Sequence, residues 1–174
     1  LAAIDIARAR DHGIPSYNEL RAAYGLPRIR SFTQLTGEAT DRFPNDPQID
    51  AADPLDDPDI LDVVDLRDAG GDVLTPGTDE GNEQAVRAVR RTTLAARLRA
   101  IYGSVDAVDA FVGMVAERHL RDSEFGALQA AVWNRQFTAL RDGDRYFYGN
   151  DAGLPFIRER YGVDYRVSLS QLIT

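Results

Sequence analysis

The chain has 174 residues, and its 28 acidic side chains outnumber the 20 basic ones, which gives a formal net charge of −8 at pH 7. The absence of Cys excludes disulfides, thiol nucleophiles, zinc sites with Cys ligands and iron–sulfur clusters. A single domain of this length buries about two-thirds of the surface that its unfolded chain exposes, so an apolar core needs no covalent crosslink.

The N-terminal part of the chain predicts three short helices with recognisable ends. The run 1–12 is apolar and Ala-rich, and it stops at Gly13 with Pro15 just beyond. It begins at Leu1 in the middle of its pattern, as a segment of a longer polypeptide would. Two later Ser residues have the spacing of capping boxes that open helices: Ser16 with Glu19, and Ser31 with Gln34.

Residues 36–84 differ in composition from the rest of the chain. They hold 15 acidic residues against Arg42 and Arg67, a net charge of −13, whereas the other 125 residues carry a net charge of +5. They also contain five of the eight Pro residues. High net charge with few apolar residues is typical of solvated, irregular chain, so we interpret 36–84 as an acidic Pro- and Gly-rich insertion within one domain that covers 1–174.

The second half of the chain predicts further helices and no strand. Apolar residues keep helical spacing from Ala85 to Tyr102, and Gly103 closes the run. No run of alternating apolar and polar residues predicts a strand, so the expected fold class is mainly α. No apolar stretch approaches the roughly 20 residues that a bilayer crossing requires, and we expect no membrane span. Further helices are predicted over 104–115, 124–140, 155–161 and from Ser168 onward.

The two histidines are the only imidazoles that this chain offers for acid–base work or metal binding. His12 ends the first predicted helix, where the helix dipole and neighbouring groups favour a structural role over ligand duty. His119 lies among charged residues, so we interpret it as a surface group.

Two charged clusters suggest other partners, but both have simpler interpretations. Asp56, Asp57 and Asp59 supply the oxygen ligands that calcium prefers, yet they lack the spacing and the glycine of a calcium loop. An Arg-rich run could contact phosphates, but the solvent face of an amphipathic helix explains it more simply, and a pI of 4.7 argues against nucleic acid. This run comprises Arg87, Arg90, Arg91, Arg97 and Arg99.

The first predicted helix carries a sharper pattern. Asp5, Arg8 and His12 fall at i, i+3 and i+7, so they project from one side of an otherwise Ala- and Ile-rich helix. A salt bridge worth roughly a few tenths of a kcal/mol is the simplest interpretation. A charged pair in a helix this apolar usually meets a partner, which composition alone does not identify.

Three segments resemble motifs of animal-type haem peroxidases, in the order in which the family has them. Residues 1–18 (LAAIDIARARDHGIPSYN) resemble a segment with an R-x-R-D-H-G-[LI]-P-x-Y-N core. Residues 111–117 (FVGMVAE) resemble W-[MV]-G-G-[LV]-x-E, and residues 136–148 (QFTALRDGDRYFY) resemble QFxxLRDGDRFWY. The chain is thereby identified as the C-terminal part of the catalytic domain of a bacterial-like member, and its fold as the mainly α C-terminal portion of that domain.

The resemblance implies haem as the cofactor, and hydrogen peroxide with halides, phenols or other small donors as substrates. Asp5 stands where many members have an Asn that hydrogen-bonds the proximal His, and Arg8 matches an Arg that meets a haem propionate. A carboxylate acceptor should push more charge onto the imidazole than an amide does and so favour ferric iron. Many members are secreted, which suggests an extracellular location.

The family's other haem-site groups lie upstream of the matching segments, and their motifs do not occur in this sequence. These groups are the proximal and distal His, the distal Arg, the carboxylates that can link to haem and a calcium loop. His12 matches a structural His of the family, so we do not assign it to iron. We therefore expect residues 1–174 alone to be inactive, because they lack an identified iron ligand and the distal acid–base pair.

Two functions of other classes stay open. The chain could be a non-catalytic helical remnant, or an interaction module whose acidic loop recruits a basic partner. Nucleic-acid binding by the Arg-rich run is a weaker alternative, which predicts affinity that falls steeply with salt.

Overall fold

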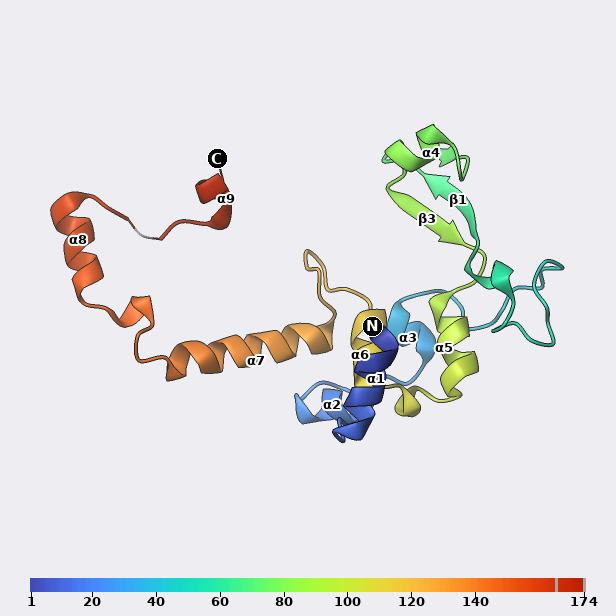
Figure 1. Cartoon of the computed structure of the whole chain (residues 1–174), viewed down its shortest axis with the longest axis horizontal. Coiled ribbons are helices and arrows are strands. Elements are labelled where there is room, and N and C mark those ends of the chain that lie inside the picture. The colour runs from blue at the N-terminus through green and yellow to red at the C-terminus, as the bar shows by residue number, and fades with distance from the viewer. Residues whose placement is uncertain (165, 174) are drawn as a thin grey trace. The chain divides into compact units, whose positions relative to one another are not determined.

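The computed structural model describes residues 1–164 and 166–173, apart from the side chains of residues 58 and 61. The chain divides into two compact units, Leu1–Ala130 and Ala131–Thr174 (Figure 1). The helices of the first unit are α1 (Ala2–Asp11), α2 (Tyr17–Ala23), α3 (Phe32–Thr36), α4 (Asp79–Gln84), α5 (Leu94–Tyr102) and α6 (Ala110–Ala116), with 3-10 turns η1 (Pro58–Leu61) and η2 (Val105–Ala107). Its strands are β1 (Val63–Arg67), β2 (Val73–Leu74) and β3 (Arg87–Arg90).

The core of the first unit lies where α2 packs on α6 and α3 packs on α5. Tyr17, Leu35 and Leu128 are each at most 1% exposed there. Gly113 lets α6 pass close to α2, because a Cβ at this position would lie 2.3 Å from the Tyr17 ring. The mainly α fold class is confirmed.

The predicted helix starts of α2 and α3 depend on their Ser caps. Ser16 and Glu19 form the expected capping box: the Ser16 hydroxyl accepts from the Glu19 N–H at 3.4 Å, and the Glu19 carboxylate accepts from the Ser16 N–H at 3.0 Å. At α3, the Ser31 hydroxyl accepts from the Gln34 N–H at 3.1 Å, but the Gln34 side chain accepts from the N–H of Arg30 instead of Ser31. The second capping box is therefore only half formed.

The prediction of one helix from Ala85 to Tyr102 is wrong in its first part. Residues 87–90 form β3, which pairs antiparallel with β1, and β1 also pairs with β2, so the strand order is β2-β1-β3. The helix begins only at Leu94, where the Thr93 hydroxyl accepts from the Ala96 N–H at 3.1 Å. The expectation of no strand is wrong for the same reason: the paired residues of β1 and β3 are 20 to 27 positions apart, so the strand is stabilised by pairing that a local pattern does not show.

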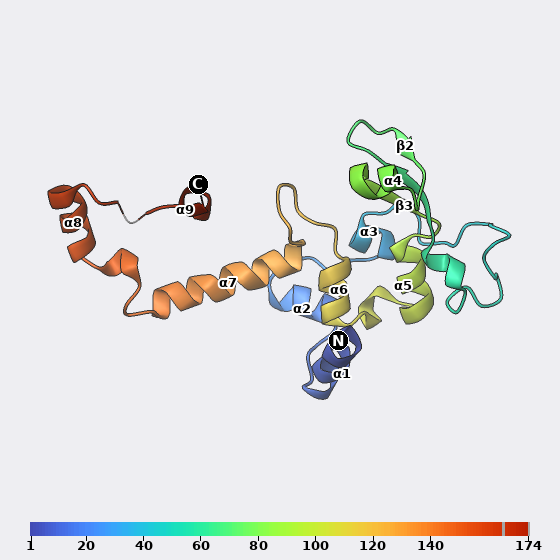
Figure 2. The same cartoon turned by 45° about the horizontal axis from the view of Figure 1, so that its top comes forward.

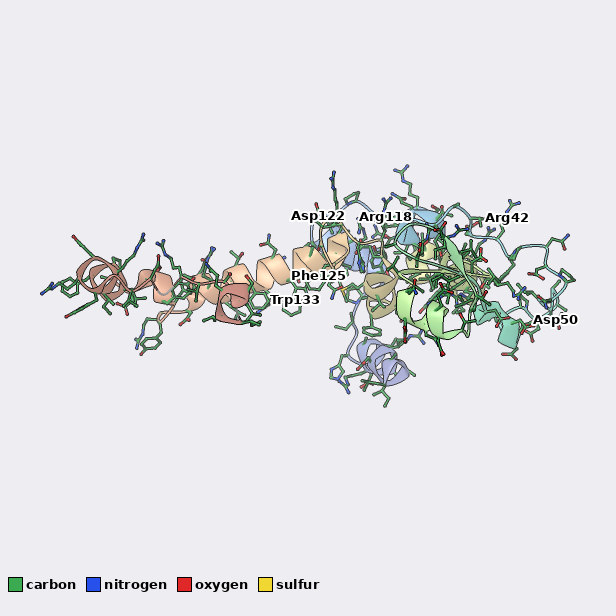
Figure 3. The ribbon with its side chains drawn as sticks, turned by 90° about the horizontal axis from the view of Figure 1, so that it is seen from above. Arg42, Asp50, Arg118, Asp122, Phe125 and Trp133 are labelled. Atoms are coloured by element: carbon green, nitrogen blue, oxygen red, sulfur yellow. The ribbon has the colours of Figure 1, made fainter. Side chains whose placement is uncertain are left out.

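Carboxylates of the acidic segment 36–84 bind the start of α5 and Arg91, which lies just before that helix. Glu38 accepts from the N–H groups of Leu94 and Ala95, at 3.0 and 2.7 Å, and so caps α5 from a distant loop. Arg91 binds Asp46 at 2.7 Å and Asp62 at 3.2 Å. Between these anchors the loop extends outward past Arg42 and Asp50 (Figure 3).

One buried ion pair joins α2 to the end of α6. Arg21 donates to Glu117, and the two side chains are only 6% and 5% exposed. The second Glu117 oxygen accepts from the Leu128 N–H at 2.9 Å, and the Arg21 Nε donates to the Pro27 carbonyl at 2.8 Å. The pair thereby connects α2, α6, the loop after α2 and the start of α7 (Ala127–Gly143).

The second unit contains the rest of α7, the 3-10 turn η3 (Tyr148–Asn150), α8 (Gly153–Tyr161) and α9 (Leu169–Ile173) (Figure 2). The Trp133 and Phe137 rings stack at 5.0 Å on α7. The Asp144 carboxylate accepts from the Tyr146 N–H at 2.8 Å and closes the turn after α7. Among the helices that the structure describes, none combines the length and the apolar character of a membrane-crossing segment.

We expect Arg21→Met to destabilise the protein by about 3–5 kcal/mol, because it leaves the Glu117 charge buried without its partner. The double variant Arg21→Met/Glu117→Leu should recover part of this loss. Arg121→Met is the control, since Arg121 is 95% exposed beside Asp122. Denaturant unfolding checks the prediction, and equal midpoints for Arg21→Met and Arg121→Met would contradict it.

Candidate functional site

The two predicted site residues lie on α1, which has no buried residue. The Arg8 side chain is 65% exposed and the Asp5 side chain is 34% exposed, and their closest charged atoms are 3.9 Å apart. Apolar Leu1 and Ile4 are also exposed, at 95% and 58%. Both polar groups are therefore available to a partner, since the weak ion pair between them satisfies neither fully.

A second charged group holds α1 to the rest of its unit. Arg10 binds Asp109 through two parallel hydrogen bonds, from Nε at 2.8 Å and from Nη2 at 2.7 Å. The Tyr102 hydroxyl donates to the same carboxylate at 2.7 Å. Asp109 is the residue before α6, and α1 packs on α6. We name the three side chains Arg10, Asp109 and Tyr102 the clamp.

The clamp determines which side of α1 stays open. Successive helical residues are about 100° apart around the axis, so Arg10 lies about 160° from Arg8 and about 140° from Asp5. One side of the helix is thus fastened to Asp109, and nearly the opposite side carries Asp5 and Arg8.

The protonation states of the clamp suit this fixed role. Hydrogen bonds from Arg10 hold the pKa of Asp109 below its usual value, with a smaller contribution from Tyr102. Burial, together with the bond to Asp109, raises the pKa of Tyr102 to about 12. At neutral pH Asp109 is therefore an anion, and Tyr102 remains a neutral donor.

The turn that follows α1 is built from Gly13, Tyr17 and Asn18, which belong to the same motif, residues 1–18, as Asp5 and Arg8. Gly13 adopts a left-handed φ of 69°, which ends the helix. The Tyr17 N–H donates to the Val108 carbonyl at 2.8 Å. The buried Asn18 amide pairs with both the N–H and the carbonyl of Ile29, at 2.8 and 2.9 Å, and donates to Asp106 at 2.7 Å. These residues are scaffold for the α1–α2 corner.

The remaining predicted candidates do not gather with Asp5 and Arg8. The side chains of His12 and His119 are both exposed, which agrees with the surface role expected for His119, and the structural role expected for His12 stays a prediction. The Asp57 carboxylate accepts from the N–H groups of Asp50 and Asp59. Within the described part of the chain, no three His, Asp or Glu side chains come together as a metal site would require.

The Arg-rich run does not lie on one helix face, so that interpretation is wrong. Arg87 and Arg90 belong to β3, and Arg91 follows the strand. Only Arg97 and Arg99 lie on α5, and Arg99 binds Asp41 at 3.0 Å. The run is split because the strand pairs with β1 instead of continuing the helix.

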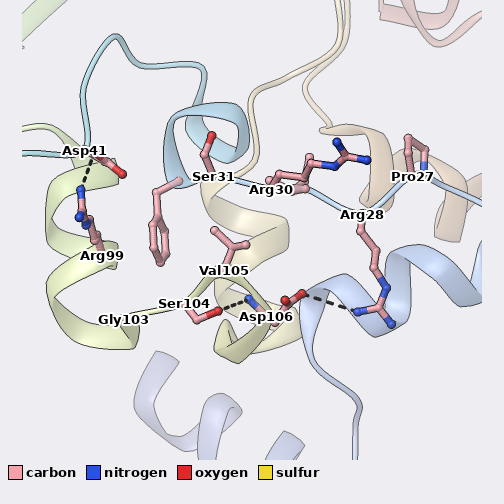
Figure 4. A pocket seen from close by; sticks show the side chains of 12 residues that line it. Pro27, Arg28, Arg30, Ser31, Asp41, Arg99, Gly103, Ser104, Val105 and Asp106 are labelled. Atoms are coloured by element: carbon pink, nitrogen blue, oxygen red, sulfur yellow. Dashed lines mark hydrogen bonds and ion pairs between the residues drawn. The ribbon is translucent and has the colours of Figure 1, made fainter.

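A cavity of about 650 Å³ lies between the loop after α2 and the end of α5, away from α1. Four of its charged residues form two ion pairs, Arg99 with Asp41 at 3.0 Å and Arg28 with Asp106 at 3.6 Å, and Arg30 also lines it (Figure 4). Asp5 and Arg8 do not line it. The cavity therefore does not form part of the α1 site.

The comparisons with known proteins agree with the motifs on α1, α6 and α7. The model of the animal haem peroxidase family matches residues 1–50 and 81–174. The chain belongs to the animal haem peroxidase family. It is 27% identical to eosinophil peroxidase of Homo sapiens over 173 residues, which are 99% of this chain and 17% of that protein. It is 29% identical to thyroid peroxidase of Canis lupus familiaris over 148 residues, which are 85% of this chain and 10% of that protein.

Among solved structures, the chain resembles peroxidase A from Dictyostelium discoideum, with 25% identity and a TM-score of 0.47. The match covers 91% of this chain and 20% of that chain. This animal haem peroxidase chain thus spans less than a fifth of the curated relatives named above.

Several peroxidase motif residues have structural reasons in this chain. Glu117, at the end of the second motif, forms the buried pair with Arg21. Gly126 must lack a side chain, because a Cβ there would lie 2.4 Å from a Glu117 oxygen. Met114, which stands where the second motif has its second Gly, is only partly exposed and leaves these contacts intact.

Sequence reasoning missed the clamp and the buried pair. Arg10 and Asp109 are 99 positions apart, and Arg21 and Glu117 are 96 apart. The one available signal was Asp109, an acid directly before the apolar run of α6. Its position is typical of a helix N-cap, but its side chain does not cap the helix.

We expect the clamp to lose strength in acid. A carboxyl whose pKa is lowered by folding stabilises the protein above its unfolded pKa, about 3.9 for Asp, and this stabilisation disappears as pH falls through the folded value. The difference in unfolding free energy between the unmodified protein and Asp109→Asn should therefore shrink below pH of about 4.

Denaturant unfolding at a series of pH values measures this difference. Tyr102→Phe is the control, because it keeps the Arg10–Asp109 pair and should retain the acid dependence. A difference for Asp109→Asn that is equal in acid and at neutral pH would contradict the role of the ionised carboxylate.

Proposed function

We propose that this chain supports haem from the proximal side in a peroxidase that uses hydrogen peroxide to oxidise halides, phenols or other small donors. The family match over residues 1–50 and 81–174 is the observation that carries this proposal. The names of the relatives, which include eosinophil and thyroid peroxidases, support the reaction class.

The exposed side of α1 fits the edge of a porphyrin. It offers a carboxylate at Asp5 and a guanidinium at Arg8 that are joined only by a 3.9 Å contact. Exposed apolar Ile4 adds a surface suited to a flat apolar ring. Neither histidine of the chain takes part in this arrangement, so the iron ligand would come from outside it.

Each of the two residues has a definite role toward the bound group. The Arg8 guanidinium would bind a propionate carboxylate through two parallel hydrogen bonds, which fixes the ring in its plane. The Asp5 carboxylate would accept the N–H of the proximal imidazole, which orients that ring and raises its basicity. Haem supplies the redox chemistry with peroxide, and the protein residues bind and orient it.

The clamp makes these roles specific. Because Arg10 fastens the opposite side of α1, Asp5 and Arg8 are held in one direction by a rigid helix. Asp109 and Tyr102 then act on the cofactor only through the position of α1.

We also propose that residues 1–174 are the C-terminal part of one peroxidase domain and that 36–84 is an insertion in it. The family model leaves out residues 51–80, which contain β1 and β2. The insertion is thus folded in its second half, where it forms two strands of the sheet.

We expect Asp5→Asn in the full polypeptide to raise the ferric/ferrous potential, because an amide donates less charge to the imidazole than a carboxylate does. Asp5→Ala should lower peroxidase activity about 10–100-fold, the usual cost of losing a partner that orients a metal ligand. Spectroelectrochemistry and steady-state kinetics measure these changes.

His12→Gln is the matched control, since His12 lies on the same side of the same helix and has no proposed contact with haem. An unchanged potential in Asp5→Asn would refute the contact with the imidazole. A full polypeptide that takes up no haem, with no Soret band, would refute the peroxidase function and favour a non-catalytic remnant.

A further inference from the structure

A groove lies beside β3, which is an edge strand of the small sheet. The strand order β2-β1-β3 leaves this edge without a partner strand in the described part of the chain. All four residues of β3 line the groove, with Gly37, Glu38 and Ala39 across from them and Thr92, Thr93 and Leu94 also in its wall. Its volume is about 650 Å³.

The groove is positively charged. Arg87 and Arg90 are exposed, and neither has an acidic partner within 4.0 Å among the described residues. Arg97 lies one turn into α5, and its Nε is buried without a hydrogen bond. Glu38, the acid in the wall, is occupied by the N–H groups of Leu94 and Ala95.

Arg97 adds positive charge beside the groove, and Glu38 offsets part of it. Burial lowers the pKa of Arg97, and the neighbouring Arg90 lowers it further. By contrast, Arg91 and Arg99, which flank the same region, are both paired with Asp residues. Among the described residues, Arg87, Arg90 and Arg97 thus lie along or beside the groove without an acidic group within 4.0 Å.

We propose that this groove binds an extended acidic segment of a partner protein, which adds to β3 as a fourth strand of the sheet. An exposed strand edge offers backbone N–H and carbonyl groups to such a segment. Arg87 and Arg90 supply charge-assisted hydrogen bonds to its carboxylates. The combination selects against apolar strands, because they would leave the guanidinium groups unpaired.

A different protein fits the groove better than a second copy of this chain. The acidic loop of a second copy is the obvious alternative, but many of its carboxylates already have intrachain partners. These are Asp41 with Arg99, Asp46 and Asp62 with Arg91, and Asp57 with backbone N–H groups. In a second copy, these four carboxylates would have to leave their partners before they could bind the groove.

The proposal is independent of the haem site. Neither Asp5 nor Arg8 lines the groove, and no residue of the clamp does. Substitutions in the groove should therefore leave the Soret spectrum and the peroxidase activity of the full polypeptide unchanged.

The test uses the full polypeptide and a fluorescein-labelled peptide, Glu-Val-Glu-Val-Glu-Val, with binding followed by fluorescence anisotropy. We expect the acidic peptide to bind, the matching Lys-Val-Lys-Val-Lys-Val peptide not to bind, and binding to weaken as ionic strength rises. Arg87→Glu and Arg90→Glu should each weaken binding about tenfold or more, the loss of one charge-assisted contact. Arg121→Glu, which changes a 95% exposed Arg elsewhere, should have no effect.

A backbone-methylated version of the acidic peptide separates strand addition from simple charge attraction. It keeps every carboxylate but lacks the N–H groups that pair with the strand edge, so its binding should be lost. Equal binding of the methylated peptide would overturn the proposal. So would tighter binding of a single-stranded oligonucleotide through the same Arg residues, or self-association of the polypeptide that Arg87→Glu abolishes.

Discussion

The fold of the first unit depends on the buried ion pair between Arg21 and Glu117. The Glu117 carboxylate accepts from the Arg21 guanidinium of α2 and from the Leu128 N–H in the first turn of α7, while the same guanidinium holds the loop after α2. Removing two charges from water is costly, and such a pair is stable only when every remaining polar atom is satisfied. Because these partners come from separate segments, the pair fixes how α2, α6 and the start of α7 meet, and the small Gly113 and Gly126 are needed beside it.

The position of α1 has a different physical origin. This helix buries no side chain, so hydrophobic packing contributes little to its placement, and the polar clamp with Asp109 carries most of it. A helix held in this way keeps its other side open. In this chain the open side carries Asp5 and Arg8. The clamp at Arg10 therefore both positions α1 in the fold and directs the two residues of the proposed cofactor contact.

Local signals in the sequence were enough to predict the ends of α1 and α2, the C-terminal end of α5 and the family. Ser16 and Glu19, Gly13 and Gly103 all lie where the predicted helices start or stop, because caps and left-handed glycines act within a few residues. The strand β3 could not be predicted in this way, since Arg87–Arg90 is extended only because β1 pairs with it. The clamp and the buried pair join residues almost 100 positions apart, so only the folded chain brings them together. Asp5 and Arg8 were found through the resemblance, and their contact with haem stays a prediction.

The most direct test of the account is the iron–imidazole stretching frequency of the ferrous full polypeptide, measured by resonance Raman spectroscopy. If Asp5 accepts the imidazole N–H, the stretch should shift to lower frequency in Asp5→Asn, because the imidazole then donates less charge to iron. Asp109→Asn, which releases α1 without touching the cofactor, should shift it in the same direction and broaden it. A frequency that is identical in the unmodified protein and in both variants would contradict the placement of α1 beside the haem.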